Sequence, residues 1–333
     1  MRKKLTAILS IVLAVMVIGC TCAFAGEADD AVYTVGICQL VQHNALDAAT
    51  KGFRDALVEE LGEDHVIFDE QNAAGDSATC ATITAGFAAS NVDLIMANAT
   101  PALQAAASAT NTIPILGTSV TDYESALNLK DFTGVVGGNI SGTSDLAPLD
   151  QQAQMIKELF PDAETVGIMY CSGEANSVYQ SKVMKGYLEE LGYKVEEYTF
   201  SDSNDVAFVT QSACDESDVL FLPTDNTAAS CTAAIDAIAR PAKTPIVCGE
   251  ENMCKGCGIA TLSISYYDLG KVTGQMAAKV LKGEENISEM PVQWAADTTK
   301  EYNVEICADL GIEIPEDYEP IATEEAAEEE TKE

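Results

Sequence analysis

The feature that most limits the possible folds of this chain is an internal repeat. The segment TVGI at 34–37 recurs at 165–168, and three more pairs follow in the same order at nearly the same separation. These pairs are KGF at 51–53 with KGY at 185–187, EELG at 59–62 and 189–192, and IPI at 113–115 with TPI at 244–246. A length of 333 residues also exceeds what one hydrophobic core usually supports. The repeat therefore predicts two similar halves.

Each half contains a short apolar run that opens with aspartate and leads into a polar loop. The runs are DLIMA at 93–97 and DVLFL at 218–222, and a helix rich in small residues is expected after each loop, beginning near Pro101 in the first half. Apolar runs without alternation are typical of parallel strands that helices cover on both faces. The sequence predicts an α/β fold of two Rossmann-like lobes, and ligands bind such sheets beyond the carboxyl ends of the strands.

Candidate ligand residues are the polar side chains that follow the predicted strands. His43 lies among them, as a ligand contact or as a surface or capping residue. The predicted ligand-binding residues are Gln39, Asp47, Asn98, Thr100, Thr121, Ser172, Glu174, Asn176, Ser177, Asp225 and Asn226.

Charge and motifs exclude several functions. The formal net charge of −35 argues against nucleic acid or an anionic lipid surface as a partner. The glycines at 134–142 lack the dinucleotide spacing, and the chain has no Walker loop and no nucleophile elbow. We expect no cofactor and no enzyme activity, although Glu174 and Asp225 could in principle act as an acid–base pair.

Residues 1–25 have the pattern of an export segment. Three basic residues precede an apolar run from Leu5 to Ile18, which is too short to span a bilayer comfortably. The sequence VIGC at 17–20 resembles a lipobox, which predicts lipidation at Cys20 and anchoring to the outer face of the cytoplasmic membrane. The alternative is cleavage after Ala25, because AFA at 23–25 fits a signal peptidase site.

The chain has eleven cysteines, of which nine follow the export segment. An odd number cannot form a complete disulfide set within one chain. Cys254 and Cys257 form a lone C-x-x-C, for which a local disulfide, free thiols and zinc are the alternatives. Because no second pair at zinc spacing and no neighbouring histidine accompany it, we predict no metal site.

Seven motifs distributed over the chain resemble one family. They are HNALD at 43–47, QNAAGD at 71–76, ATPALQAA at 99–106, SVTD at 119–122, GEANSVYQ at 173–180, PTDN at 223–226 and YYDLG at 266–270. The resemblance covers about Thr34 to Pro315 and is to the ABC-transporter substrate-binding family that includes the tryptophan- and tyrosine-binding proteins of Firmicutes. It implies a type I periplasmic-binding-protein-like fold, closure by a hinge, an ABC permease as partner and a monomer.

The resemblance implies a small amino acid as the ligand, most plausibly tryptophan or tyrosine. The ammonium of such a ligand needs a carboxylate, which we assign to Asp225, although Asp225 could equally be a helix N-cap. Its carboxylate needs donors, which Thr100, the free N–H groups after Pro101, Ser172 and Asn176 could supply. Tyr170, Tyr266 and Tyr267 are candidate ring partners or core residues.

The expected domain organisation has five parts: an export segment at 1–25, a first lobe at 32–150 with a crossover from the C-terminal part, a second lobe at 151–290, a return crossover and helix at 291–315, and an acidic disordered tail at 316–333. The predicted function is capture of an amino acid outside the cytoplasm and its delivery to a membrane permease. The alternatives are a sensor module for another small neutral solute, or an exported enzyme.

Overall fold

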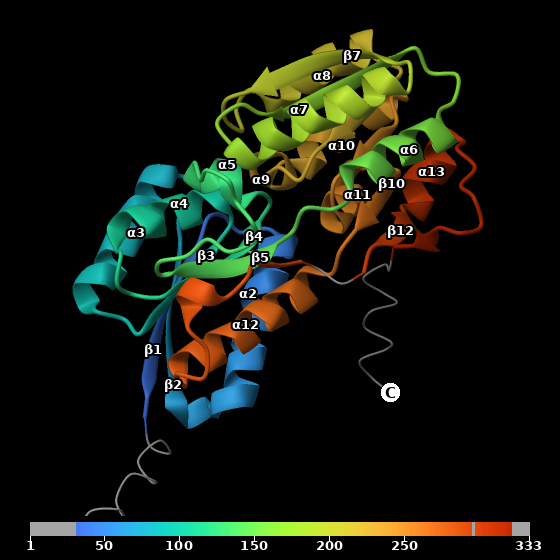
Figure 1. The fold of residues 1–333 in the computed structure, drawn as a ribbon. Helices are drawn as coiled ribbons and strands as arrows, with labels where there is room; N and C mark the ends of the chain where they lie inside the picture. The colour runs from blue at the N-terminus through green and yellow to red at the C-terminus, as the bar shows by residue number, and fades with distance from the viewer. Residues whose placement is uncertain (1–30, 295–296, 322–333) are drawn as a thin grey trace, which may run out of the picture. The chain divides into compact units, whose positions relative to one another are not determined.

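A computed structural model describes residues 31–294 and 297–321. The described residues from Tyr33 onward belong to one compact unit that contains two β-sheets with helices packed against them (Figure 1). The export segment, Cys20 and both proposed cleavage sites lie outside the described residues. Within the part of the chain that the structure describes, no helix is long and apolar enough to cross a membrane.

The first sheet has six parallel strands in the order β11-β5-β4-β3-β1-β2. They are β1 (Tyr33–Gln39), β2 (Val66–Asn72), β3 (Leu94–Asn98), β4 (Ile115–Val120), β5 (Ile140–Ser144) and β11 (Gln293–Trp294). Its helices are α2 (Asn44–Leu61), α3 (Ser77–Ser90), α4 (Thr100–Ala109), α5 (Tyr123–Leu127) and α12 (Tyr266–Leu281), with the 3-10 turns η1 (Glu63–His65) and η2 (Ile287–Glu289). Every residue of β3 is buried, as its uninterrupted apolar run predicts.

The second sheet has seven strands in the order β13-β12-β10-β9-β8-β6-β7. They are β6 (Thr165–Cys171), β7 (Lys194–Phe200), β8 (Val219–Leu222), β9 (Ile246–Cys248), β10 (Ala260–Ser263), β12 (Thr299–Tyr302) and β13 (Glu319–Pro320). All neighbours are parallel except β10 and β12. The helices are α6 (Leu149–Leu159), α7 (Ala175–Glu190), α8 (Val206–Glu216), α9 (Asn226–Ala229), α10 (Thr232–Ala242), α11 (Glu251–Cys257) and α13 (Val304–Leu310).

The two sheets repeat one topology. The order β2-β1-β3-β4 in the first matches β7-β6-β8-β9 in the second, and the repeated TVGI segments both lie in the corresponding strands β1 and β6. The prediction of an α/β fold with two similar lobes is therefore confirmed. Local signals start the helices as expected, since Asp76 caps α3 through the N–H of Ala78 and Pro101 occupies the first turn of α4.

Helix α12 belongs to the first sheet, although residues 266–281 fall inside the range expected for the second lobe. It lies beside α2 (Figure 1) because glycines let the two backbones approach. A Cβ atom at Gly270 would collide with the carbonyl oxygen of Ala49, and one at Gly52 would collide with that of Tyr267. The chain thus crosses between the sheets after β5, after β10 and after β11.

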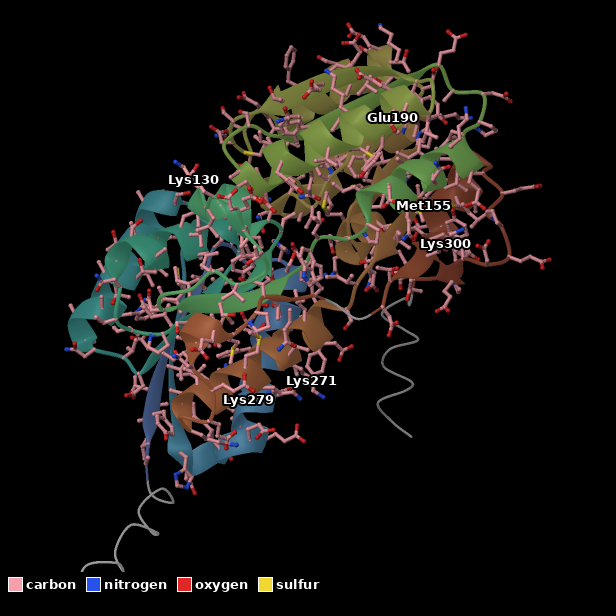
Figure 2. All side chains as sticks on the ribbon, viewed as in Figure 1. Lys130, Met155, Glu190, Lys271, Lys279 and Lys300 are labelled. Carbon is pink, nitrogen blue, oxygen red and sulfur yellow. The ribbon has the colours of Figure 1, made fainter. Side chains whose placement is uncertain are left out.

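The last described residues belong to the second sheet, whereas a disordered tail was expected from residue 316. Strand β13 pairs with β12, and the buried ring of Tyr318 donates its hydroxyl to Glu158. Lys300, labelled in Figure 2, donates to both Glu158 and Asp317. These contacts hold the chain as far as Ile321, and the acidic residues 322–333 lie outside the described residues.

All nine cysteines within the described residues are free. Seven of the nine are buried, including Cys254 and Cys257 in α11. Among the described residues, no group of three or more histidine, cysteine, aspartate or glutamate side chains could hold a metal ion. Buried thiols of this kind pack as small apolar side chains.

Candidate ligand site

A narrow cavity of about 10 Å³ lies where loops of both sheets meet. Its walls come from the start of α2, the ends of β4 and β5, the loop after β8 and the starts of α7, α11 and α12. The lining residues are His43, Ala45, Leu46, Ser119, Thr121, Asp145, Asn176, Thr224, Asp225, Asn226, Ala229, Glu250, Met253 and Tyr266. Nine of these fourteen residues are polar or charged, five are apolar or aromatic, and none is lysine or arginine.

Four buried polar atoms on the cavity wall have no hydrogen-bond partner. They are His43 Nδ1, Ser119 Oγ, Asp145 Oδ1 and Asn176 Oδ1. A buried polar atom without a partner costs about 1–3 kcal/mol, so such atoms are rare in folded proteins. Four further atoms of this kind, Asn98 Oδ1, Thr100 Oγ1, Gln152 Oε1 and Thr261 Oγ1, lie elsewhere among the described residues. A polar molecule or a water in the cavity would supply partners for the four on its wall.

Asn176 presents an acceptor to the cavity. Its amide nitrogen Nδ2 lies 3.2 Å from Glu174 Oε2 and 3.1 Å from the carbonyl oxygen of Thr224, so its donors are already used within the protein. The unpartnered Oδ1 can only accept. A ligand that satisfies Asn176 must therefore bring an N–H or O–H donor.

Asp145 presents a carboxylate oxygen. It follows β5 and is almost fully buried, and the hydroxyl of Tyr266 donates to its Oδ2 at 2.8 Å. Burial raises the pKa of Asp145 above its ordinary value, and hydrogen bonding from Tyr266 and from the side chain of Thr121 opposes that rise. A cation next to Oδ1 would stabilise the charged carboxylate in a site that is otherwise unfavourable for it.

Ser119 reaches the cavity through an irregularity in β4. The pairing of β4 with β5 shifts between Gly117 and Val120, and Ser119 has a φ of 54°, in the left-handed region. Serine adopts this conformation infrequently, and a bulge of this kind redirects the side chain of the extra residue. The resulting unpartnered hydroxyl can donate or accept.

Asp225 lines the cavity but uses its oxygens on the backbone. Oδ1 accepts the N–H of Ala228 and Oδ2 accepts the N–H of Cys171, both at 2.7 Å. Burial, followed by the nearby charge of Glu174, raises the pKa of Asp225 to about 7. Of the two interpretations of its sequence, the N-cap is what the structure shows, because Asp225 caps α9.

Glu174 organises the same loop from the start of α7. Its carboxylate accepts the backbone N–H groups of Asn226 and Thr227, the side chains of the same two residues, and Asn176 Nδ2. With so many donors already bound, Glu174 fixes α9 against α7. It does not line this cavity.

In the first lobe, the predicted residues Gln39, Asp47 and Asn98 form a network with Thr50 instead of lining the cavity. Gln39 Nε2 donates to Asp47 at 2.6 Å, Thr50 donates to Gln39 Oε1 at 2.6 Å, and Asn98 Nδ2 donates to Thr50 at 2.9 Å. These contacts join the ends of β1 and β3 to α2. Thr100 is buried in the first turn of α4, outside the cavity lining.

Of the eleven predicted residues, Thr121, Asn176, Asp225 and Asn226 line the cavity. Ser172 instead donates to the carbonyl oxygen of Phe200, and Ser177 accepts from Asn176. The prediction did not include Ser119, Asp145, Glu250 or Met253 among the ligand residues. Asp145 follows the polar strand ISGTS, which lacks the apolar run that identified the other strand ends.

Two similar α/β lobes with a polar cavity at their strand ends define a solute-binding protein of the two-lobed type. The comparisons with known proteins agree with this class. Residues 34–325 match the family model described as ABC transporter substrate binding protein. The chain belongs to this family.

Three relatives illustrate the similarity. A tyrosine-binding protein of Clostridioides difficile strain R20291 is 37% identical over 267 residues, which are 79% of this chain and 76% of that protein. An ABC domain from Streptococcus pneumonia in complex with L-Trp has a TM-score of 0.82 and 35% identity, covering 86% of this chain and 97% of that one. The ligand-free, open structure of a substrate-binding protein with adhesive properties from Clostridium difficile has a TM-score of 0.67 and 38% identity, covering 88% and 100%.

Both the family and these relatives are binding proteins rather than enzymes. The fold is of the type I periplasmic-binding-protein class, as the resemblance implied.

Proposed function

We propose that this chain captures an aromatic L-amino acid, tyrosine or tryptophan, outside the cytoplasm and delivers it to an ABC permease. The observation that carries the proposal is the group of four unpartnered buried polar atoms around one cavity. Because Asp145 Oδ1 and Asn176 Oδ1 are acceptors, the cavity suits a ligand with several donors, such as an ammonium group.

Asp145 is the proposed partner of the ligand ammonium. It offers a free, buried carboxylate oxygen, whereas both oxygens of Asp225 already accept backbone N–H groups. The hydroxyl of Ser119 is the proposed donor for the ligand carboxylate. Leu46, Met253 and Tyr266 supply apolar surface for an aromatic side chain, which the names of the relatives favour as the ligand.

Closure of the two lobes around the ligand is part of the proposal. Cavity residues come from both sheets, so a bound molecule contacts both lobes at once. The chain also matches the complex with L-Trp with a higher TM-score than the ligand-free open relative, although its identity to the two is similar. A closed conformation of this chain would give this order of TM-scores, because the two lobes of such proteins move as rigid units about the crossover segments.

Isothermal titration calorimetry tests the ligand assignment. The chain from residue 26 to 333 is titrated with each of the twenty amino acids, and we expect L-tyrosine or L-tryptophan to bind most tightly. At a ligand concentration a hundredfold above Kd, the folded protein gains about 2.7 kcal/mol, which is measurable as a rise in Tm. Binding of another solute class with no response to any amino acid would overturn the assignment.

Lipidation of Cys20 places the protein on the outer face of the membrane in this proposal. Wild-type chain expressed in a Gram-positive host should fractionate with the membrane and incorporate a labelled fatty acid. Cys20→Ala should lose the label and appear in the medium. Release of the wild-type chain with an N-terminus after Ala25 would favour the alternative cleavage site instead.

A further inference from the structure

His43 occupies a position where its side chain could simply cap a helix, but it does not. It is the N-cap residue of α2, and its side chain makes no capping hydrogen bond. One ring nitrogen, Nε2, instead lies 3.3 Å from Asn226 Oδ1, at the start of α9. The imidazole therefore joins a helix that packs on the first sheet to a helix of the second lobe.

The orientation of Asn226 fixes which nitrogen of His43 carries the proton. Asn226 Nδ2 donates to Glu174 Oε2 at 2.7 Å, so the amide oxygen Oδ1 is the atom that faces His43. An amide oxygen can only accept, and Nε2 must then be the donor. In a neutral imidazole the other nitrogen, Nδ1, is an acceptor.

Nδ1 is the atom that lacks a partner. It is buried on the cavity wall with no hydrogen bond. The contact with Asn226 through Nε2 and the unpartnered acceptor Nδ1 thus belong to the same ring. A hydrogen bond accepted by Nδ1 therefore favours the tautomer that carries its proton on Nε2.

We propose that His43 couples ligand binding to closure of the lobes: Nδ1 accepts a hydrogen bond from an N–H or O–H of the bound amino acid while Nε2–H donates to Asn226 across the cleft. Without a ligand donor, closing the lobes buries an unsatisfied acceptor, which opposes closure. With the donor in place, the ring is held in the tautomer that the contact with Asn226 requires. The inference rests on the proposed function, because it needs a ligand in this cavity.

The surroundings of the ring favour the neutral form on which this coupling depends. Burial lowers the pKa of His43, while the hydrogen bond to Asn226 and the charges of Glu174 and Asp47 partly oppose that change. The groups that influence the charge of the ring are thus one amide and two carboxylates.

Tautomer-sensitive ¹⁵N NMR of histidine side chains tests the proposal directly. The chain has two histidines, and His65→Gln assigns the remaining signals to His43. Upon saturation with the amino acid that binds in calorimetry, we expect a neutral ring protonated at Nε2, with the Nδ1 resonance moved upfield by the new hydrogen bond. A ring protonated at Nδ1 in the complex, or an Nδ1 resonance that ligand does not move, would overturn it.

A double-mutant cycle supplies an independent readout. His43→Ala should weaken binding about tenfold, equivalent to about 1.4 kcal/mol, and Asn226→Ala should weaken it less. If the two residues act as one unit, the double variant binds about as well as His43→Ala, whereas independent effects would multiply and contradict the coupling. His65→Gln is the matched control and should leave Kd within about twofold of wild type, since changes away from a site are nearly neutral.

The outcomes separate this inference from the proposed function. Wild-type protein that binds no amino acid overturns both. Wild-type protein that binds tyrosine or tryptophan, with His43 signals and affinities that do not respond as described, leaves the proposed function standing and removes the role of His43.

Discussion

The polar side chains at the ends of β1 and β3 differ from those on the cavity wall in how many of their hydrogen bonds are made. Gln39, Thr50 and Asn98 donate hydrogen bonds within one network, in which Asn98 Oδ1 has no partner, whereas Ser119 Oγ and Asp145 Oδ1 belong to cavity-lining residues and have no partners. Residue type does not separate the two groups, because both combine amides, hydroxyls and carboxylates. The difference teaches that unmade hydrogen bonds indicate a binding site where several of them line one cavity, whereas a single unpartnered oxygen such as Asn98 Oδ1 also occurs inside a structural network.

The largest expected effect is a loss of ligand affinity when Asp145, one of the unpartnered residues on the cavity wall, is changed. Asp145→Asn keeps the shape of the side chain but leaves a ligand ammonium buried without its counter-charge, which typically costs about 2–5 kcal/mol. We expect Kd for tyrosine or tryptophan to rise at least about thirtyfold in calorimetry. The free variant should be as stable as wild type or more stable, since it no longer buries a carboxylate. Near-normal affinity would remove Asp145 from the site.

The pH dependence of binding sharpens the same assignment. Burial raises the pKa of Asp145 in the free protein, and a ligand ammonium beside it would lower that pKa, so binding releases a proton when the carboxyl is protonated. Affinity should therefore fall as the pH drops below the raised pKa, by at most about tenfold per pH unit. Calorimetry from pH 4.5 to 8 measures this slope. A slope unchanged in Asp145→Asn would assign the proton to another group, such as Asp225 or Glu250.

Asn98→Ala should have the opposite effects to Asp145→Asn: lower stability of the folded protein and nearly unchanged ligand affinity. Asn98 Nδ2 donates to the carbonyl oxygen of Leu46 and to Thr50, and both would lose a buried donor. We expect a loss of about 1–3 kcal/mol of unfolding free energy in urea denaturation. Kd should stay within a few-fold of wild type. A large loss of affinity in a variant of normal stability would place Asn98 in the binding site after all.

Asp225→Asn gives the smallest expected effect and divides the two interpretations of that residue. Asparagine can still cap α9 through its amide oxygen, but the N–H of Cys171 loses its acceptor, which should cost about 1 kcal/mol of stability. Its effect on Kd should be clearly below that of Asp145→Asn. If affinity falls further in Asp225→Asn than in Asp145→Asn, the ammonium partner is Asp225, as the sequence alone indicated.

The sequence by itself determined the architecture because the signals for it are local or periodic. The repeated TVGI segments lie in corresponding strands, and the apolar runs 94–97 and 219–222 became buried strands. The N-cap Asp76 of α3 and the first-turn proline Pro101 of α4 each act within one turn of helix. The sequence did not predict that α12 packs on the first sheet. Gly52 and Gly270 permit the close approach of α2 and α12, but this role is recognisable only when the two helices are seen side by side.

Only the tertiary structure decided which polar residues are left for a ligand. Asp225 accepts a hydrogen bond from the N–H of Cys171, 54 residues earlier in the chain. Glu174 accepts one from the N–H of Asn226 at the start of α9, 52 residues later. Asp145 stays available because the hydroxyl of Tyr266 donates to Oδ2, whereas Oδ1 has no geometric hydrogen bond and has only the side chain of Thr121 nearby. Whether a polar atom has a hydrogen-bond partner depends on which other atoms lie near it in the folded chain. Residues far apart in the sequence supply those partners, so the sequence pattern alone does not identify them.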